Sequence, residues 1–209
     1  MSSGRRILVA TRSTGKLREL DGILAAAGMH GLSLVEAGIG ESPDEDEIEC
    51  HGTFEENALA KARHFNRLSG LPTIADDSGL CVDAFGGAPG VRSKRYSGRS
   101  DLSGQALDDA NNAKLIGELA GFRDRAAGYV CAAAFADGAL EIVERGETRG
   151  SIVVEPRGLS GFGYDPYFHS DELGMTFGEA TTGSKQGVSH RGRAFRALFD
   201  ALAARQRSQ

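Results

Sequence analysis

Residues 6–16 read RILVATRSTGK, and this stretch joins an apolar strand to a helix. The run over residues 6–10 predicts a buried strand, and the apolar positions that follow have helical spacing over about 14–27. Gly28 is a natural end for that helix. A buried strand leading directly into a helix is typical of α/β proteins.

The rest of the chain extends this pattern. Thr53 and Glu56 have the spacing of a capping box, in which each side chain satisfies the other's backbone N–H, and they predict a helix over about 53–68. Asp137-Gly138 predicts a hairpin turn. Further helices are expected at 103–119 and 191–203, and strands at 32–36, 73–75, 80–85, 129–135, 140–145 and 152–154. The order predicts an α/β fold with a mixed sheet flanked by helices.

The composition and net charge of the chain argue against several functional classes of protein. The chain has 209 residues, of which 40% are apolar, and its net charge is 24 − 29 = −5. This charge argues against a nucleic-acid partner, since such proteins carry basic surfaces. No apolar run approaches the ~20 residues of a membrane helix, so no membrane partner is expected. The N-terminus has no secretory segment and the three cysteines have no CxxC spacing, so we expect a cytoplasmic protein.

The turn from Thr11 to Lys16 is a candidate phosphate site. A strand-to-helix turn gathers unpaired backbone N–H groups and the positive end of the helix at one point. Hydroxyls and a lysine there can bind phosphate. The turn is not a Walker A loop, because Ala10 replaces the first glycine and Leu17 replaces the final hydroxyl. An ordinary helix cap with a solvated lysine is the competing interpretation.

Acidic residues offer a second candidate. Asp76-Asp77-Ser78-Gly79 follows a short apolar strand, and adjacent carboxylates repel, so one is often neutral or bound to metal. Carboxylates suit Mg²⁺, and one of them can take a proton from water. Glu49 ends an acidic loop that could fold back toward this pair. A turn with an Asx motif and a solvated acidic loop are the alternatives.

Two later segments could bind a planar base. Residues 161–166 read GFGYDP, in which Phe162 or Tyr164 could stack on a base and Asp165 could hold its edge. Lys185 and the run Ser189-His190-Arg191-Gly192 place cationic or switchable groups near the last helix. An aromatic-anchored loop and a capped helix start are the alternatives.

The chain also holds seven short segments in a fixed order. They are Ala10-Thr11…Gly15-Lys16, Thr53-Phe54…Glu56-Asn57-Ala58, Ala75-Asp76-Asp77-Ser78-Gly79-Leu80, Gly86-Gly87-Ala88-Pro89-Gly90, Arg95-Tyr96-Ser97-Gly98, Gly161-Phe162-Gly163-Tyr164-Asp165-Pro166 and Ser189-His190-Arg191-Gly192. Together they resemble the inosine triphosphate pyrophosphatase family, over about residues 6–203.

The resemblance implies Mg²⁺-dependent hydrolysis of ITP, dITP and XTP to the monophosphate and pyrophosphate. It implies one two-lobed domain over residues 1–209, with a long mixed twisted sheet, the nucleotide in a cleft between the lobes, and a homodimer. Asp77 would activate water, and Glu49, Asp76 and Asp77 would surround the metal. Substrate would be bound by Thr11, Arg12, Ser13, Thr14, Gly15, Lys16, Lys61, Ser78, Phe162, Gly163, Tyr164, Asp165, Lys185, His190 and Arg191.

Two positions depart from the family pattern. Family members usually have Asn at the place of Ser13 and Glu-Thr-Gly at the place of Glu49-Cys50-His51. Three alternative functions remain open at this point: a broader pyrophosphatase for modified or pyrimidine nucleotides, a nucleotide sensor without hydrolysis, and a nucleic-acid-binding module.

Overall fold

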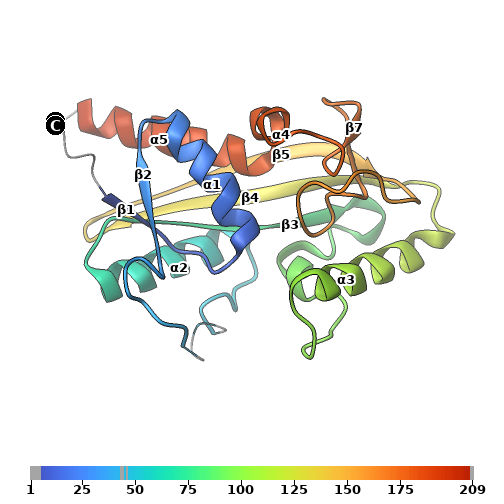
Figure 1. Cartoon of the computed structure of the whole chain (residues 1–209), viewed down its shortest axis with the longest axis horizontal. Helices are drawn as coiled ribbons and strands as arrows, with labels where there is room; N and C mark the ends of the chain where they lie inside the picture. The colour runs from blue at the N-terminus through green and yellow to red at the C-terminus, as the bar shows by residue number, and fades with distance from the viewer. Residues whose placement is uncertain (1–5, 43–44, 46, 208–209) are drawn as a thin grey trace. The chain divides into compact units, whose positions relative to one another are not determined.

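The computed structural model describes residues 6–42, 45 and 47–207, and the strands of this part form one seven-stranded sheet in the order β2-β1-β3-β4-β5-β6-β7 (Figure 1). The strands are β1 (Arg6–Val9), β2 (His30–Ser33), β3 (Thr73–Val82), β4 (Ala126–Asp137), β5 (Leu140–Ile152), β6 (Phe168–Ser170) and β7 (Met175–Thr176). The helices are α1 (Thr14–Ala26), α2 (Phe54–Ser69), α3 (Gly104–Glu118), α4 (Thr182–Val188) and α5 (His190–Arg207), with 3-10 turns η2 (Asp83–Phe85), η3 (Gly90–Arg95) and η4 (Leu119–Gly121).

The sheet is mixed. β1 pairs in parallel with both β2 and β3, whereas β6 pairs antiparallel with β5 and β7. The predicted α/β fold with a mixed sheet flanked by helices is therefore confirmed. None of the described helices has the length and apolar character that crossing a membrane requires.

The chain divides into two compact units. Unit 1 holds the residues up to Asp77, Cys131–Gly146 and those from Arg191 on, and unit 2 holds Ser78–Val130 and Glu147–His190. The long strands β3, β4 and β5 contribute to both units.

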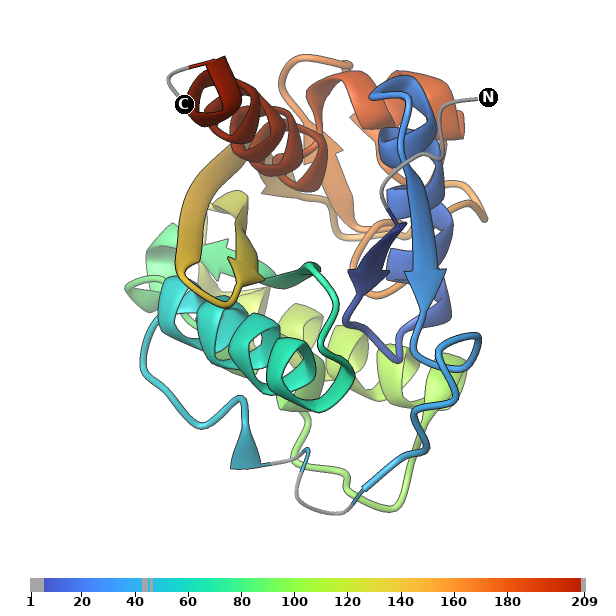
Figure 2. The ribbon, with the colours of Figure 1, turned by 90° about the vertical axis from the view of Figure 1, so that its left-hand side faces the viewer.

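In unit 1, α1 and α5 lie on one face of the sheet and α2 lies on the other (Figure 1 and Figure 2). Leu20, Ile23 and Leu24 of α1 pack with Phe195 and Leu198 of α5 in one apolar cluster with strand residues. Each such side chain contributes ~1.5–3 kcal/mol when it is fully buried. This packing fixes the start of α1 against the sheet.

Unit 2 has its own core, which is largely aromatic. Tyr129 of β4, Phe168 of β6 and Phe177 share a cluster with Leu115 of α3 and Leu80 of β3. The Tyr129 and Phe168 ring centroids are 4.7 Å apart, and the Tyr129 and Phe177 rings are stacked at 5.9 Å. Tyr164, from the glycine-rich loop that precedes β6, belongs to the same cluster, so this core anchors the loop.

Local signals placed the helix starts correctly. Ser13 caps α1 and Thr53 caps α2, each accepting a hydrogen bond from the amide three residues later. Only half of the predicted capping box forms, because the Glu56 carboxylate accepts from the Thr53 hydroxyl instead of its backbone N–H. α2 ends at Gly70, which has a φ of 69°.

Several strands differ from their predicted limits. The strand expected at 32–36 is β2 at His30–Ser33, and of the strand expected at 152–154 only Ile152 lies in a strand, as the last residue of β5. The two short strands expected at 73–75 and 80–85 are joined in one continuous strand, β3, which ends at Val82, and residues Asp83–Phe85 form the 3-10 turn η2. The polar side chains in the middle of β3 bind partners from other segments, so the chain can continue as a strand where its composition is typical of a turn.

Candidate active site

Two hydroxyl groups shape the turn between β1 and α1. Thr11 Oγ1 accepts a hydrogen bond from the Ser13 amide at 3.2 Å, and Ser13 Oγ accepts one from the Lys16 amide at 3.3 Å. The helix cap of the competing interpretation is therefore present, but its solvated lysine is not, because Lys16 pairs with Asp76. The capped start of α1 is also positively polarised, so it can still attract a phosphate. Thr14 and Gly15 form the first residues of this helix.

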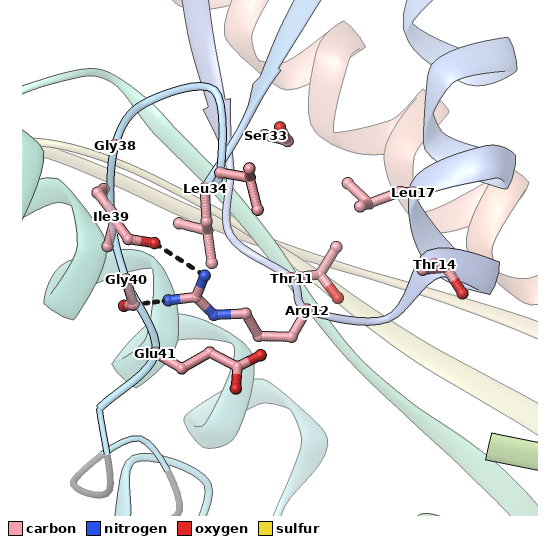
Figure 3. Close-up of a pocket in the computed structure, with 11 residues that line it drawn as sticks. Thr11, Arg12, Thr14, Leu17, Ser33, Leu34, Gly38, Ile39, Gly40 and Glu41 are labelled. Atoms are coloured by element: carbon pink, nitrogen blue, oxygen red, sulfur yellow. Dashed lines mark hydrogen bonds between the residues drawn. The ribbon is translucent and has the colours of Figure 1, made fainter. Parts of the chain in front are cut away.

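Arg12 is bound to the loop that follows β2 (Figure 3). Its guanidinium donates to the carbonyl oxygens of Ile39 at 2.9 Å and Gly40 at 2.6 Å, and its Nη2 lies 2.7 Å from Glu45 Oε1. Arg12 also lines a cavity of about 440 Å³ beside the β1–α1 turn. The resemblance placed Arg12 at the substrate, whereas the structure commits its guanidinium to anchoring this loop.

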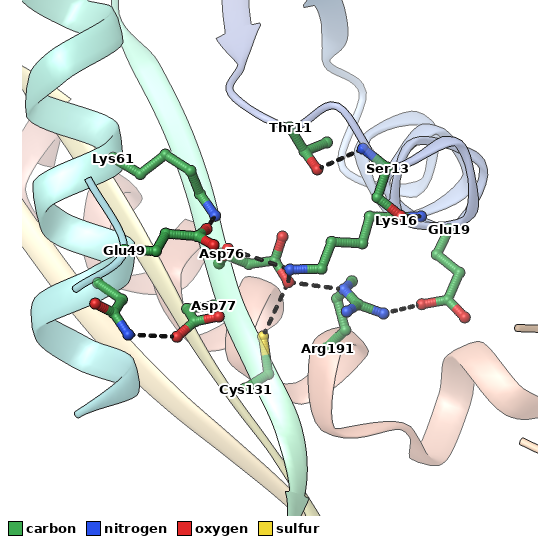
Figure 4. Close-up of polar contacts among 11 residues, drawn as sticks. Thr11, Ser13, Lys16, Glu19, Glu49, Lys61, Asp76, Asp77, Cys131 and Arg191 are labelled. Carbon is green, nitrogen blue, oxygen red and sulfur yellow. Dashed lines mark hydrogen bonds and ion pairs between the residues drawn. The ribbon is translucent and has the colours of Figure 1, made fainter. Parts of the chain in front are cut away.

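Asp76 and Asp77 lie inside β3, so the expectation that they follow the end of a short strand is wrong, and so is the alternative of an Asx turn. Successive side chains of a strand point to opposite faces. Asp76 accordingly faces α1 and α5, while Asp77 faces α2, as their partners show (Figure 4). The sequence analysis expected these adjacent carboxylates to repel each other, but the strand places them on opposite faces of the sheet.

Two cations surround Asp76. Lys16 Nζ lies 3.1 Å from Asp76 Oδ2 and donates to the Asp76 carbonyl oxygen at 3.4 Å. Arg191 Nε donates to Asp76 Oδ2 at 3.1 Å, and Arg191 Nη1 forms a close ion pair with Glu19. The Asp76 side chain is fully buried and that of Arg191 is 2% exposed. We call Lys16, Glu19, Asp76 and Arg191 the Asp76 network.

The Asp76 network holds its charges firmly. Burial opposes ionisation of Asp76, but Lys16, Arg191 and Lys61 outweigh it and hold the pKa of this carboxyl well below its usual range. Burial also opposes the charge on Lys16, yet Asp76 and other carboxylates raise the Lys16 pKa above its ordinary value. Both groups are therefore charged at neutral pH.

Asp77 has a different environment, formed by α2 and the loop before it. Asn57 Nδ2 donates to Asp77 Oδ2 at 2.9 Å. Lys61 of α2 forms a close ion pair with Glu49. Burial raises the pKa of Asp77, and the nearby Glu49 carboxylate adds to this, against the opposing effects of Lys16, Lys61 and Asn57. Such a carboxylate is a better proton acceptor than an ordinary aspartate.

The arrangement fits a hard divalent cation on two of the three predicted ligands. Glu49 and Asp77 are close enough for their charges to interact, and carboxylate oxygens are the ligands that Mg²⁺ prefers. Asp76 instead pairs with Lys16 and Arg191 on the other face of β3. Within the described ranges, no group of three or more His, Cys, Asp or Glu side chains is placed to hold a metal. A Mg²⁺ ion held here would take further ligands from water and substrate.

In unit 2, the loop at 161–165 is organised around Asp165. The Asp165 carboxylate accepts from the Phe162 amide at 2.9 Å and lies 2.6 Å from Lys185 Nζ, and both charged side chains are buried. Lys185 Nζ also lies 5.3 Å from the centre of the Phe162 ring and 5.1 Å from that of Phe177. The structure thus joins three of the predicted base-binding residues in one cluster.

The other predicted residues of unit 2 have distinct surroundings. Tyr164 is buried and its hydroxyl donates to the Ser93 carbonyl oxygen at 2.7 Å, which leaves Phe162 as the stacking candidate in this loop. The His190 ring is buried and stacks on Tyr129 with centroids 4.5 Å apart. Ser78 is half-buried within β3, one residue after Asp77.

Sequence reasoning missed several residues that act through the predicted ones. Glu19 lies three residues after Lys16 on α1, a spacing that placed both on one helix face and was the available signal. Asn57 belongs to a quoted segment but had no assigned role. The pairing of Arg191 with Asp76 joins residues 115 positions apart and had no local signal.

The sequence of this chain is similar to those of known proteins over nearly its whole length. A model of the Ham1 family matches residues 7–201. A dITP/XTP pyrophosphatase of Ralstonia nicotianae is 46% identical over 201 residues, covering 95% of this chain and 96% of the relative. The corresponding protein of Frankia alni is 48% identical over 201 residues, covering 94% and 96%.

Solved structures agree. A HAM1 protein from Coxiella burnetii has a TM-score of 0.80 at 33% identity, covering 96% of this chain and 99% of that one. A nucleoside-triphosphatase / dITP/XTP pyrophosphatase from Mycobacterium abscessus has a TM-score of 0.69 at 41% identity, covering 94% and 99%. Because these matches span nearly the whole chain, the predicted resemblance is confirmed and the chain belongs to the Ham1 family.

Proposed function

We propose that this chain hydrolyses the nonstandard purine nucleotides ITP, dITP and XTP to the monophosphate and pyrophosphate in a Mg²⁺-dependent reaction. The enzyme class follows from the family: the chain is a nucleoside triphosphate pyrophosphatase, a hydrolase. The observation that carries the proposal is the placement of charged groups on both faces of β3: Lys16 pairs with Asp76 on one face, and on the other Asn57 binds Asp77 near the ion pair of Lys61 with Glu49.

In this proposal the triphosphate binds at the β1–α1 turn. Thr11, Ser13 and the N-terminal amides of α1 supply hydrogen-bond donors, and the Lys16 ammonium offsets phosphate charge. Asp76 acts on the substrate indirectly, because its ion pairs hold Lys16 and Arg191 in place. Positioning and charge stabilisation dominate catalysis at phosphorus centres, so this prealignment is the main contribution of the turn.

Asp77 is the proposed general base. It accepts a proton from the water that attacks the α-phosphorus, and pyrophosphate leaves. Asn57 orients the Asp77 carboxylate through the hydrogen bond to Oδ2. Glu49 and Asp77 would hold Mg²⁺, which when bound neutralises phosphate charge and activates the phosphorus toward attack.

Base recognition is assigned to unit 2. Phe162 would stack on the purine, while Lys185, Asp165 and His190 would line the rest of the site. A 6-oxo group accepts hydrogen bonds from a donor such as the Lys185 ammonium, whereas the 6-amino group of adenine cannot, so adenine would leave this donor without a base partner. The arrangement therefore supports 6-oxopurines as substrates.

Two further features belong to the proposal. We place the enzyme in the cytoplasm, where nucleotide pools are maintained, and we propose that it works as a homodimer. The negative net charge of −5 supports a small-molecule substrate over a nucleic-acid partner.

The deciding experiment incubates the purified chain with dITP or ITP and Mg²⁺, with and without chelator, and identifies the products. We expect chelator-sensitive release of pyrophosphate together with the monophosphate. Release of orthophosphate with the diphosphate would overturn the site of cleavage. Tight binding without product would overturn hydrolysis and indicate a nucleotide sensor.

A further inference from the structure

Outside the predicted site residues, two side chains of α3 contact the glycine-rich loop. Asp108 Oδ2 accepts a hydrogen bond from the Gly163 amide at 2.8 Å. Asn112 Nδ2 donates a hydrogen bond to the Gly163 carbonyl oxygen at 2.9 Å. Both polar groups of one residue are thus held by one helix.

The spacing of Asp108 and Asn112 explains how both can bond to Gly163. Asp108 and Asn112 are four residues apart on α3, so their side chains share one face of the helix. Gly163 lies 55 and 51 positions away from them along the chain. Its φ of 63° is in the left-handed region, which glycine adopts without steric cost, and glycine also has the most backbone freedom to lose, so contacts that fix its peptide have an effect here.

Gly163 lies between two residues that are proposed to bind the base. It lies directly after Phe162, whose ring faces Lys185, and two residues before Asp165, whose carboxylate bonds Lys185. A rotation of the Gly163 peptide would move the Phe162 ring and the Asp165 carboxylate relative to each other. The α3 contacts prevent that rotation from outside the loop, while Asp165 restrains it from inside.

The side chain of Asn112 contributes its hydrogen bond to Gly163 more than it contributes apolar packing. The residue is 5% exposed, and within the described part of the chain its Oδ1 atom has no hydrogen-bond partner. A buried acceptor without a partner is unfavourable, and an apolar residue of similar size would avoid it. The amide donor to Gly163 is the one hydrogen bond that the described structure gives this side chain.

We propose that Asp108 and Asn112 are positioning residues that hold the Gly163 peptide so that Phe162 and Asp165 form a preorganised site for the base. The inference rests on the proposed function, in which this loop binds the purine. It assigns to α3 a part in substrate affinity, although neither side chain needs to touch the nucleotide.

Base binding far from the α-phosphorus contributes equally to the ground state and the transition state, so its loss raises KM and leaves kcat unchanged. We expect Asp108→Ala and Asn112→Ala each to raise the KM for dITP about tenfold, the effect of one lost hydrogen bond, with kcat within about twofold of the parent. Asp109→Ala is the matched control, because Asp109 is exposed on the same helix and bonds Gln105 instead of the loop.

Isosteric exchanges sharpen the test. Asp108→Asn keeps an oxygen that accepts from the Gly163 amide, so we expect KM within about twofold of the parent. Asn112→Asp removes the donor and places a carboxylate against the Gly163 carbonyl oxygen, so we expect at least the loss seen with Asn112→Ala. Opposite outcomes from two equally conservative exchanges would not arise from general destabilisation.

Inorganic triphosphate, which has no base, serves as the second probe. Its inhibition constant against dITP should stay within about twofold of the parent in every variant, because the phosphate-binding turn is unchanged. Thermal unfolding of each variant confirms that it is folded.

Two results would overturn the positioning role: a parental KM in both alanine variants, or a triphosphate inhibition constant that rises in parallel with KM. If the parental chain releases no pyrophosphate from dITP or XTP, the proposed function fails first and this inference fails with it. A parent that is active, with variants of unchanged KM, refutes only the inference.

Discussion

Replacing Arg191 with methionine tests the Asp76 network most directly. The guanidinium is 2% exposed, bonds Asp76 Oδ2 at 3.1 Å and pairs closely with Glu19. Methionine fills much of the volume, but it leaves Asp76 paired with Lys16 without the guanidinium and removes the ion pair of Glu19 with Arg191.

The expected loss follows from these contacts. Removing one partner of a buried ion pair destabilises a protein by ~3–5 kcal/mol, because the remaining charge stays buried. For a chain of about 200 residues, each kcal/mol lowers Tm by ~2–4 °C, so we expect a decrease of roughly 6–20 °C.

Thermal unfolding followed by circular dichroism measures this change. Arg196→Met is the control, since Arg196 is exposed on the same helix, α5, and exposed substitutions change stability by ~0.5 kcal/mol or less. Adding Glu19→Gln to Arg191→Met should recover part of the loss by removing one of the two carboxylates. A decrease in Tm for Arg191→Met no larger than that of the control would refute the reasoning.

Three other outcomes are expected from the same structure. Asp77→Asn should lower kcat by roughly 10²-fold or more, the scale of a lost general base, while dITP binding persists; near-parental turnover would show that Asp77 is not the base. Gly161→Ala should raise the KM for dITP more than Gly163→Ala, because both glycines have a positive φ but only at Gly161 would the added methyl group also collide with the Asp165 carboxylate, and equal KM values would contradict this. Comparing kcat/KM for ITP, XTP, GTP and ATP should place ATP lowest, and equal values would remove the proposed role of the 6-oxo group.

Local signals in the sequence determined much of the fold. Ser13 and Thr53 are helix caps that act through hydrogen bonds to amides three residues away, so their effect is readable within one turn of chain. The hairpin at Asp137-Gly138 and the helix at α3 follow from the same kind of short-range pattern. The seven short segments were sufficient to identify the family, because the order of segments along the chain can be read directly from the sequence.

The acidic segment shows where local reasoning fails. Asp76-Asp77-Ser78-Gly79 has the composition of a turn, yet it forms the middle of β3. Turn preference reflects polar side chains that bond their own backbone. In the fold these carboxylates have stronger partners from distant segments, namely Lys16 and Arg191 for Asp76 and Asn57 for Asp77.

The sequence by itself determined the starts of α1, α2, α3 and α5, the mixed α/β class, the family and the identity of most candidate residues, whereas α4 was not predicted. Tertiary structure decided which face of β3 each aspartate occupies, and so which of them meets the cations of α1 and α5. It also decided that Arg12 anchors a loop and that α3 holds Gly163. These contacts join residues tens of positions apart, and their geometry is fixed by the packing of helices on the sheet, which no local pattern of side chains specifies.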